Sequence, residues 1–390
     1  MLLKLRFLTA GESHGRGLIS LLEGIPSGLA LNASDIDADL KRRQQGYGRG
    51  GRMKIEQDRA IILTGVRWGK TIGSPISLLI ENRDWENWCN GMSPDAACDG
   101  SIPPVTRPRP GHADLAGAVK YGHKDVRNIL ERSSARETAA RVAAGAVARK
   151  FLAEFGITIG SYVIRIGSVA LPVDSEEDSV EIISKAESSE VRCPDNETSS
   201  RMIVLIDEAR QKGDTLGGIF KVIINGIPAG LGSHIQWDKR LNSRLMAAIS
   251  SIQAVKGVEI GLGFRAAERF GSDVMDVISY SKDSGFGRHT NNAGGIEGGI
   301  SNGMPIVIRA AMKPIPTLRT PLRSTDLVTK EAIEAAYERS DTCAVPAASV
   351  IAEAMASICI ADAMLEKFGG DTIDETKRNF FAYKEYIRQF

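Results

Sequence analysis

Two long segments rich in small residues place the strongest limit on how this chain can fold. They are SARETAARVAAGAVARKFLAEFG (134–156) and PAASVIAEAMASICIADAMLEKFG (346–369). The first ends at Gly156, a residue type that commonly stops a helix. Its N-terminal half carries few large side chains, so a neighbouring element can approach its backbone closely. The sequence therefore predicts two helices that lie between other elements.

The rest of the chain alternates strand patterns with further helices. Residues 32–45 predict a helix with Ser34 as its N-cap and acidic residues in its first turn. Residues 174–190 predict an acidic surface helix. Short apolar runs of strand length occupy 3–9, 18–25, 59–82 (two strands) and 157–171.

An internal echo suggests a duplication. LISLLEGIPSGL (18–29) resembles FKVIINGIPAGL (220–231), and Arg132 precedes the first small-residue helix as Arg339 precedes the second. One short match could be chance, but two in the same order favour a repeated β–α unit. We therefore expect an α+β fold with antiparallel sheets outside and the small-residue helices between them. The chain would form a single domain over 1–390, with similar halves at roughly 1–200 and 201–390.

Composition excludes several classes of protein. The chain has 390 residues, 43% hydrophobic and 25% charged, with a net charge of +1. That charge gives no global attraction to nucleic acid or membrane, so an anion site must be a local cluster of arginines. The five cysteines contain no CxxC, which favours free thiols in the cytoplasm and argues against a metal site. We expect no targeting segment and no stretch that approaches a membrane span.

Two of the five histidines are next to glycines and close to arginines. They are His14 in GESHGRG and His112 in RPRPGHADL. Histidine exchanges a proton near neutral pH, so both are candidate acid–base groups. A lone histidine is more often structural than catalytic, and that alternative stays open for each.

Other clusters offer anion sites, each with a simpler alternative. RRQQGYGRGGRM (42–53) combines glycine backbone with arginines and is either an anion cradle or a solvated basic loop. ERSSARETA (131–139) predicts a helix start, which either binds an anion or is simply capped by serine. HTNNAGGIEGGISNG (289–303) predicts a flexible lid over a ligand or a plain surface loop. Asp341 follows Arg339, and a surface ion pair is the alternative to a functional role.

Nucleotide-binding signatures are absent from the sequence. GVRWGKT (65–71) has glycines one residue too close for a P-loop and is followed by a strand pattern where a helix is required. No GxGxxG follows a strand. The missing P-loop argues against a kinase, and the net charge argues against an RNA-binding protein that uses Arg-Gly loops.

Taken together, the motifs resemble chorismate synthase over nearly the whole chain. They are GESHGRG, GYGRGGRM, RPGHADL, RSSARETAARVAAGA, GDTLGG, AVKGVEIG, NNAGGIEGGISNG, KPIPT and RSDTCAVPAASVIAEA. The resemblance implies a lyase that removes phosphate from 5-enolpyruvylshikimate 3-phosphate by 1,4-elimination, giving chorismate in aromatic amino acid biosynthesis. It also implies reduced FMN, a homotetramer and a β-α-β sandwich fold.

The same resemblance assigns roles to individual residues. His14 would protonate the leaving phosphate, His112 would stabilise the reduced, anionic flavin, and Asp341 would help remove the ring hydrogen through flavin N5. Arginines would surround the substrate's phosphate and two carboxylates. These arginines are Arg49, Arg52, Arg109, Arg136 and Arg339.

The implied cofactor contacts come from several segments. The residues matched to FMN contacts are Arg132, Ser133, Ser134, Gln253, Ala254, Gly298, Lys313, Pro314, Ile315, Pro316, Thr317 and Arg339. Arg43 and Arg49 match positions associated with NADP, so NADPH is a possible reductant. Many members of the family instead receive reduced flavin from outside, which would make an external flavin reductase a partner.

Overall fold

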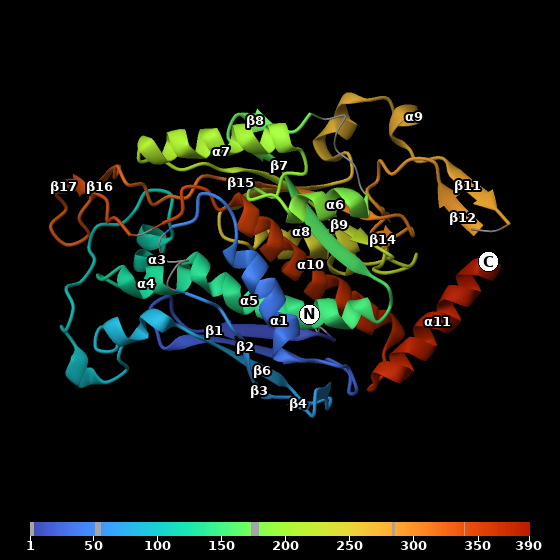
Figure 1. Ribbon diagram of the computed structural model, residues 1–390, viewed down its shortest axis with the longest axis horizontal. Coiled ribbons are helices and arrows are strands. Elements are labelled where there is room, and N and C mark those ends of the chain that lie inside the picture. The colour runs from blue at the N-terminus through green and yellow to red at the C-terminus, as the bar shows by residue number, and fades with distance from the viewer. Residues whose placement is uncertain (1–3, 51–55, 173–178, 283–284, 339) are drawn as a thin grey trace.

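The computed structural model describes residues 4–50, 56–172, 179–282, 285–338 and 340–390 (Figure 1). The helices are α1 (Ala33–Gln44), α3 (Asp114–Tyr121), α4 (Arg127–Ser133), α5 (Thr138–Ala153), α6 (Val180–Glu187), α7 (Asn196–Gln211), α8 (Leu241–Ser250), α9 (Gly271–Val274), α10 (Val345–Phe368) and α11 (Ile373–Gln389). The longer strands are β1 (Arg6–Ala10), β2 (Gly17–Glu23), β3 (Ile61–Thr64), β6 (Ile76–Glu81), β7 (Thr158–Ile166), β9 (Gly218–Asn225), β10 (Val255–Ile260), β11 (Ile278–Ser281), β12 (Gly285–Arg288) and β15 (Ile306–Met312). The shorter strands are β4 (Val66–Arg67), β5 (Lys70–Thr71), β8 (Val169–Ala170), β13 (Ile296–Glu297), β14 (Ile300–Ser301), β16 (Arg323–Thr325) and β17 (Ala332–Glu334).

The two small-residue helices, α5 and α10, contact each other at the centre of the protein. A Cβ atom built on Gly145 of α5 would lie 2.3 Å from the Cβ of Ala354 on α10. No side chain fits in that space, so the close approach depends on glycine at this position. The prediction that small residues let a neighbour pack closely is confirmed.

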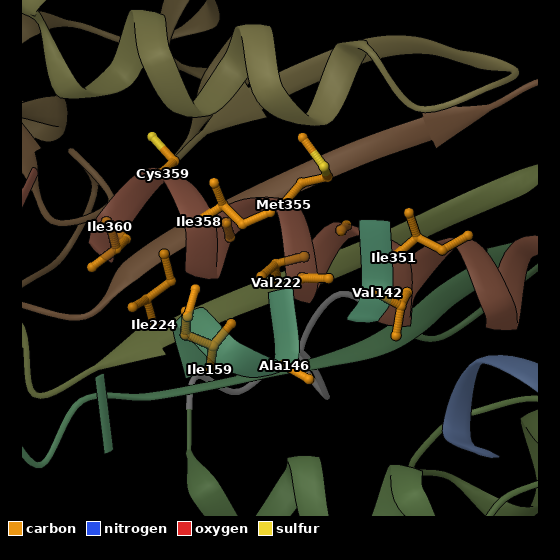
Figure 2. Close-up of a cluster of buried hydrophobic side chains, with 14 of the residues drawn as sticks. Val142, Ala146, Ile159, Val222, Ile224, Ile351, Met355, Ile358, Cys359 and Ile360 are labelled. Atoms are coloured by element: carbon orange, nitrogen blue, oxygen red, sulfur yellow. The ribbon is translucent and has the colours of Figure 1, made fainter. Parts of the chain in front are cut away.

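Larger apolar side chains surround this contact. Figure 2 shows Ile351 and Met355 of α10 in one cluster with Val142 and Ala146 of α5 and Val222 of β9. All five are buried. Apolar burial contributes roughly 25 cal/mol per Å², so this central cluster is a main source of stability.

Sheets lie on both sides of the helix pair. The sheet β1-β2-β6-β3 is antiparallel and contacts α5, while the antiparallel sheet β10-β15-β9-β7-β8 contacts α10 through β7 and β9. Figure 1 shows the helices between the four-stranded sheet below and the five-stranded sheet above. The structure is therefore a mixture of helix and sheet, consistent with the expected α+β class.

Helix α10 corrects one expectation from the sequence. It is 24 residues long and apolar enough to cross a membrane by length and composition. Its most apolar stretch is 100% buried inside the protein. A long apolar helix arises here because both of its sides face other elements of the core.

Local details differ from the sequence predictions in three places. Helix α1 is capped by Asn32 rather than Ser34, with Asp35 completing a capping box. The stretch 59–82 contains the hairpin β4–β5 between its two predicted strands. Of the predicted helix at 174–190, α6 covers the middle, and 174–178 lie outside the described residues.

Candidate active site

A cavity of about 610 Å³ opens where several loops meet the N-terminal halves of α5 and α10. Its volume is in the range of sites that enclose a cofactor or a small molecule. The predicted site residues on its wall are His14, Arg43, Arg49, Arg109, His112, Ser133, Ser134, Arg136, Gln253, Ala254, Lys313, Ile315, Pro316, Thr317 and Asp341. Arg132, Pro314 and Gly298 are not on the wall, and Arg52 and Arg339 lie outside the described residues.

His14 lies in the turn between β1 and β2 and is fixed by α4. Its Nδ1 is 2.8 Å from Oε1 of Glu131, and its backbone N–H donates to Oε2 of the same carboxylate at 2.7 Å. The ring stacks on Trp88, with centroids 4.3 Å apart. An ionised carboxylate can only accept, so Nδ1 is the donor in this pair. The imidazole therefore has a defined orientation on the cavity wall.

His112 has its own carboxylate partner at the start of α3. Its Nδ1 is 2.5 Å from Oδ1 of Asp114, which is fully buried. Arg109 donates to Asp114 Oδ2 through Nε at 2.8 Å and to Thr317 through Nη1 at 3.0 Å. Burial favours the neutral acid, but hydrogen bonds from His112 and Arg109 outweigh it and hold the pKa of Asp114 below its ordinary value.

Two arginines share a buried carboxylate beneath the cavity. Asp58 binds both Arg43 and Arg136, and Arg136 also donates to Asn82 at 2.9 Å. Arg43 is 3% exposed, and burial lowers its pKa to about 10 although Asp58 opposes this. Within the described chain, Arg136 Nη2 is buried and has no hydrogen-bond acceptor; Glu56 Oε2 lies 3.6 Å away.

Asp341 lies in the segment before α10 and pairs with Arg49. Its Oδ2 is 2.7 Å from Arg49 Nη1, and its Oδ1 accepts the backbone N–H of Gly50 at 2.7 Å. The partner expected from the sequence was Arg339, which lies outside the described residues. The segment is held because Thr342 donates to the carbonyl of Gly48 at 2.8 Å. The carboxylate is thus presented between an arginine and the cavity.

The opposite wall is formed by the segments around 253 and 313. Ala254 has φ +67°, a strained value for a residue with a side chain, and its carbonyl accepts the backbone N–H of Lys313 at 2.9 Å. Gln253 Oε1 is buried without a hydrogen-bond partner among the described residues. Burial and the charge of Lys256 lower the pKa of Lys313, so two cations lie near each other here. An orphaned acceptor and paired cations suit a polar, anionic ligand.

A close backbone approach supports the KPIPT segment. A Cβ built on Gly217 would lie 2.3 Å from the carbonyl oxygen of Met312. Thr215 donates its hydroxyl to the carbonyl of Ile315 at 2.7 Å. Residues of the GDTLGG motif therefore help to hold the segment 313–317 in place.

The structure corrects the interpretation of the motif ERSSARETA as a helix start. Arg132 and Ser133 end α4 rather than begin a helix, because Ser134 has extended dihedral angles and separates α4 from the 3₁₀ turn Ala135–Glu137. Ser134 caps that turn by accepting from the N–H of Arg136, which is the simpler reading of the motif. Arg132 instead donates to the carbonyls of Thr9 and Gly11.

The glycine-rich segment 289–303 forms the hairpin β13–β14. Asn291 links two parts of the chain: its Nδ2 donates to the carbonyl of Pro305, just after the segment, and its Oδ1 accepts the backbone N–H of Gly295 within it. Gly298 is exposed at the turn of the hairpin. The described residues of the cavity wall do not include this segment, so its role as a lid stays a prediction.

Sequence reasoning missed several residues of the site. Asp114 is two positions after His112 in RPGHADL, and Glu131 begins the motif ERSSARETA. Both residues therefore lie in motifs that the sequence singles out, but the sequence assigned no function to either of them. Lys256 lies in the motif AVKGVEIG but was given no role, and Trp88 lies in no motif that marks it as a site residue. Their places depend on contacts between segments far apart in the chain.

One cavity brings His14, His112 and Asp341 together with four arginines, an arrangement suited to an anionic small molecule and to proton transfer. The family model for chorismate synthase matches residues 5–365. The chorismate synthases of Aquifex aeolicus (strain VF5) and Geobacter sulfurreducens are each 58% identical to this chain, covering 99% of it and 99% and 100% of the respective relatives. A solved structure titled "Crystal Structure of Chorismate Synthase" superposes with a TM-score of 0.82 at 48% identity, covering 99% of both chains.

This chain belongs to the chorismate synthase family. It is therefore a carbon–oxygen lyase that acts on a small-molecule phosphate. The prediction of family and enzyme class from the sequence motifs is confirmed.

Proposed function

We propose that this chain converts 5-enolpyruvylshikimate 3-phosphate to chorismate by 1,4-elimination of phosphate, with FMN bound in its reduced form. The observation that carries the proposal is a single cavity that holds His14, His112 and Asp341 together with four arginines. The substrate has a phosphate and two carboxylates, so its binding requires several cations in one place. The arginines already meet this requirement.

The residues of the wall fit an FMN molecule. The buried Gln253 Oε1 lacks a donor among the described residues, and the flavin ring offers N–H groups. Lys256 and Lys313 provide positive charge suited to a phosphate. Reduced flavin, when bound, supplies electron density as the allylic C–O bond of the substrate breaks. Ser133, Ser134 and residues 313–317 would hold it.

The chain's own groups then handle charge and protons. His14 gives a proton to the departing phosphate, and Arg136 and Arg49 neutralise the anion as it forms. His112 stabilises negative charge beside the cofactor residues. Asp341 accepts a proton as the ring hydrogen leaves, and Arg49 and the backbone N–H of Gly50 hold its carboxylate in place. The family resemblance suggests these roles, and the place of each group on the cavity wall supports them.

Anaerobic turnover tests this proposal. Phosphate and chorismate release is measured with pre-reduced FMN, with oxidised FMN, and with oxidised FMN plus NADPH. We expect activity with reduced FMN and no stoichiometric consumption of it. Equal turnover with oxidised FMN and no reductant would remove the flavin from the mechanism.

The assay with oxidised FMN and NADPH tests whether the chain can use NADPH to reduce its own flavin. Arg43 is 3% exposed, and its three donor groups contact Thr138, Asp58 and Ala135. A side chain so fully engaged is poorly placed to bind a second nucleotide, which favours supply of reduced flavin by an external reductase. Activity with NADPH and oxidised FMN alone would reverse this view.

We also infer that the chain forms one domain of two similar halves in a β-α-β sandwich, and that it assembles as a homotetramer in the cytoplasm. The two copies of the repeated motif contain β2 and β9, each bonded on both sides by antiparallel strands. The outer face of the four-stranded sheet exposes apolar side chains that a partner copy would cover. They are Leu8, Ile19, Leu21, Ile61 and Leu63. Light scattering on the 42.0 kDa chain measures the assembly directly.

A further inference from the structure

Glu131 is a buried carboxylate for which the proposed chemistry has no role. It lies in α4, and its side chain is 2% exposed. Its two oxygens both bind His14, one through Nδ1 and the other through the backbone N–H. The backbone carbonyl of Glu131 also accepts the N–H of Ser13 at 2.9 Å. Helix α4 therefore holds the His14 turn at three points.

Two further side chains complete the arrangement. The ring of Trp88 stacks on His14, and the Arg127 guanidinium carbon lies 4.9 Å from the centroid of the same indole. Arg127 Nη1 is 3.5 Å from Glu131 Oε1, so the buried carboxylate has a permanent cationic partner. Glu131 therefore faces the positive charge of Arg127 in addition to the ring of His14.

An ionised Glu131 controls which nitrogen of His14 exchanges protons. The carboxylate accepts only, so Nδ1 keeps its proton in both the charged and the neutral ring. The proton that leaves the imidazolium must then come from Nε2, and the ring that remains is the neutral Nδ1–H tautomer. Because Trp88 holds the plane of the ring, the hydrogen bond fixes its remaining freedom, which is rotation within that plane.

We propose that Glu131 is the positioning residue of His14: it retains the Nδ1 proton, so that Nε2 is the nitrogen that protonates the departing phosphate. The inference rests on the proposed role of His14. It is independent of how flavin is reduced. Glu131 touches neither substrate nor cofactor in this scheme and acts only through the histidine.

The first test is spectroscopic and requires no turnover. Long-range ¹H–¹⁵N correlation spectra of the apoenzyme, labelled at its five histidines, report the tautomer of each neutral ring. His14→Ala identifies the signals of His14 by their absence. We expect His14 in the Nδ1–H form. A neutral His14 that carries its proton on Nε2 would overturn the proposal.

The second test is kinetic. Glu131→Gln leaves one acceptor oxygen for the two His14 donors that Glu131 now serves, so the ring loses its fixed tautomer. We expect kcat to fall by roughly 10- to 1000-fold with KM nearly unchanged, because arginines supply substrate affinity. Glu86→Gln, an exposed carboxylate two residues from Trp88, is the matched control and should retain parental kinetics.

A double-mutant cycle separates positioning from general damage. In a His14→Ala background, Glu131→Gln should cost little further activity, because its only route of action is already lost. A further loss as large as in the parent would mean that Glu131 acts on the fold, and the proposal fails. Full activity of His14→Ala would instead refute the proposed role of His14, while the NMR result would still decide the tautomer.

Discussion

Replacing Glu353 with glutamine should destabilise the protein by an amount that can be derived from its surroundings. Glu353 lies in the middle of α10 and is 1% exposed. Its carboxylate contacts Arg42 at 2.8 Å, Arg149 at 2.9 Å and Arg192 at 3.1 Å, and it accepts the hydroxyl of Ser161 at 2.6 Å. These partners come from α1, α5, β7 and the segment after α6. The cluster thus joins the central helices to the five-stranded sheet.

The charges in this cluster balance only when Glu353 is ionised. Asp39 contacts Arg42 and Arg149, and Glu187 contacts Arg42 and Arg192. Three arginines therefore face three carboxylates. Glutamine at 353 would leave one buried positive charge without compensation, a change that typically costs about 3–5 kcal/mol.

The pKa of Glu353 gives a second route to the magnitude. Burial alone would raise it, but the charges of Arg42, Arg149 and Arg192 outweigh burial and lower the pKa of Glu353 from 4.5 to about 2. At about 1.4 kcal/mol for each pH unit, the ionised carboxylate contributes roughly 3 kcal/mol. Because the folded-state pKa is lowered, this contribution is complete above about pH 5 and is lost as pH falls towards 2. The cost expected for an uncompensated buried charge and the contribution derived from the pKa of Glu353 therefore agree at about 3 kcal/mol.

Thermal and urea unfolding of both proteins at several pH values provide the assay. Unfolding entropy is roughly 2.1 cal/mol/K per residue, so over 390 residues a loss of about 3 kcal/mol lowers the melting temperature by about 4 °C at pH 7. The difference between the two proteins should shrink between about pH 5 and pH 3. Glu366→Gln on the same helix is the control: its side chain is 43% exposed and pairs with Arg244, so the loss should be at most about 1 kcal/mol. Equal stability of Glu353→Gln and the parent at pH 7, or a deficit that does not change with pH, would refute the reasoning.

Four further substitutions test the site and the core. His14→Ala and His112→Ala should each lower kcat by something on the order of 10²–10⁴ while substrate still binds, and near-full activity of either across pH 6–8 would make that histidine structural. Asp341→Asn keeps the shape and removes the base, so turnover should fall by roughly 10² and the effect of deuterium at the abstracted ring position should grow; a loss explained wholly by weaker FMN binding would leave Asp341 only as the partner of Arg49. Gly145→Ala gains about 1 kcal/mol of helix propensity, but its Cβ would meet Ala354 at 2.3 Å. The destabilisation from overpacking, roughly 1–3 kcal/mol or more, should exceed the gain in helix propensity. Calorimetry should therefore show a lower melting temperature for the variant. A higher melting temperature would mean that the two helices can move apart without a loss of stability.

The sequence predicted the central helices well because their signals are local. The segment 346–369 became α10 at Val345–Phe368, within a residue at each end. Small side chains, a proline at the helix start and a glycine after its end all lie within the segment itself. The expectation that no stretch approaches a membrane span was wrong for this helix, because its length and composition are sufficient, although its most apolar stretch is buried inside the protein.

Partners in the site were harder to predict than its members. His14, His112 and Asp341 do line one cavity, as the motifs indicated. Asp341, however, pairs with Arg49, which is far away in the chain. Arg132 lies in the last turn of α4, where its guanidinium donates to the carbonyls of Thr9 and Gly11. A helix boundary that shifts by a few residues changes which way every following side chain faces.

The pairing of the cavity's arginines and of its two histidines with carboxylates explains how so many of these groups can share one cavity. Arg43, Arg136 and Arg49 repel one another, and the nearby arginines help to lower the pKa of Arg43. Without Asp58 and Asp341 these side chains would separate until an anion arrived, and substrate binding would have to bring them back together. With the carboxylates in place, the donors already have their geometry, so binding energy is not consumed in ordering them. The same logic applies to the histidines, since a fixed ring delivers its proton to one place. The carboxylates behind the cavity therefore contribute to catalysis by positioning groups, although they need not touch the substrate.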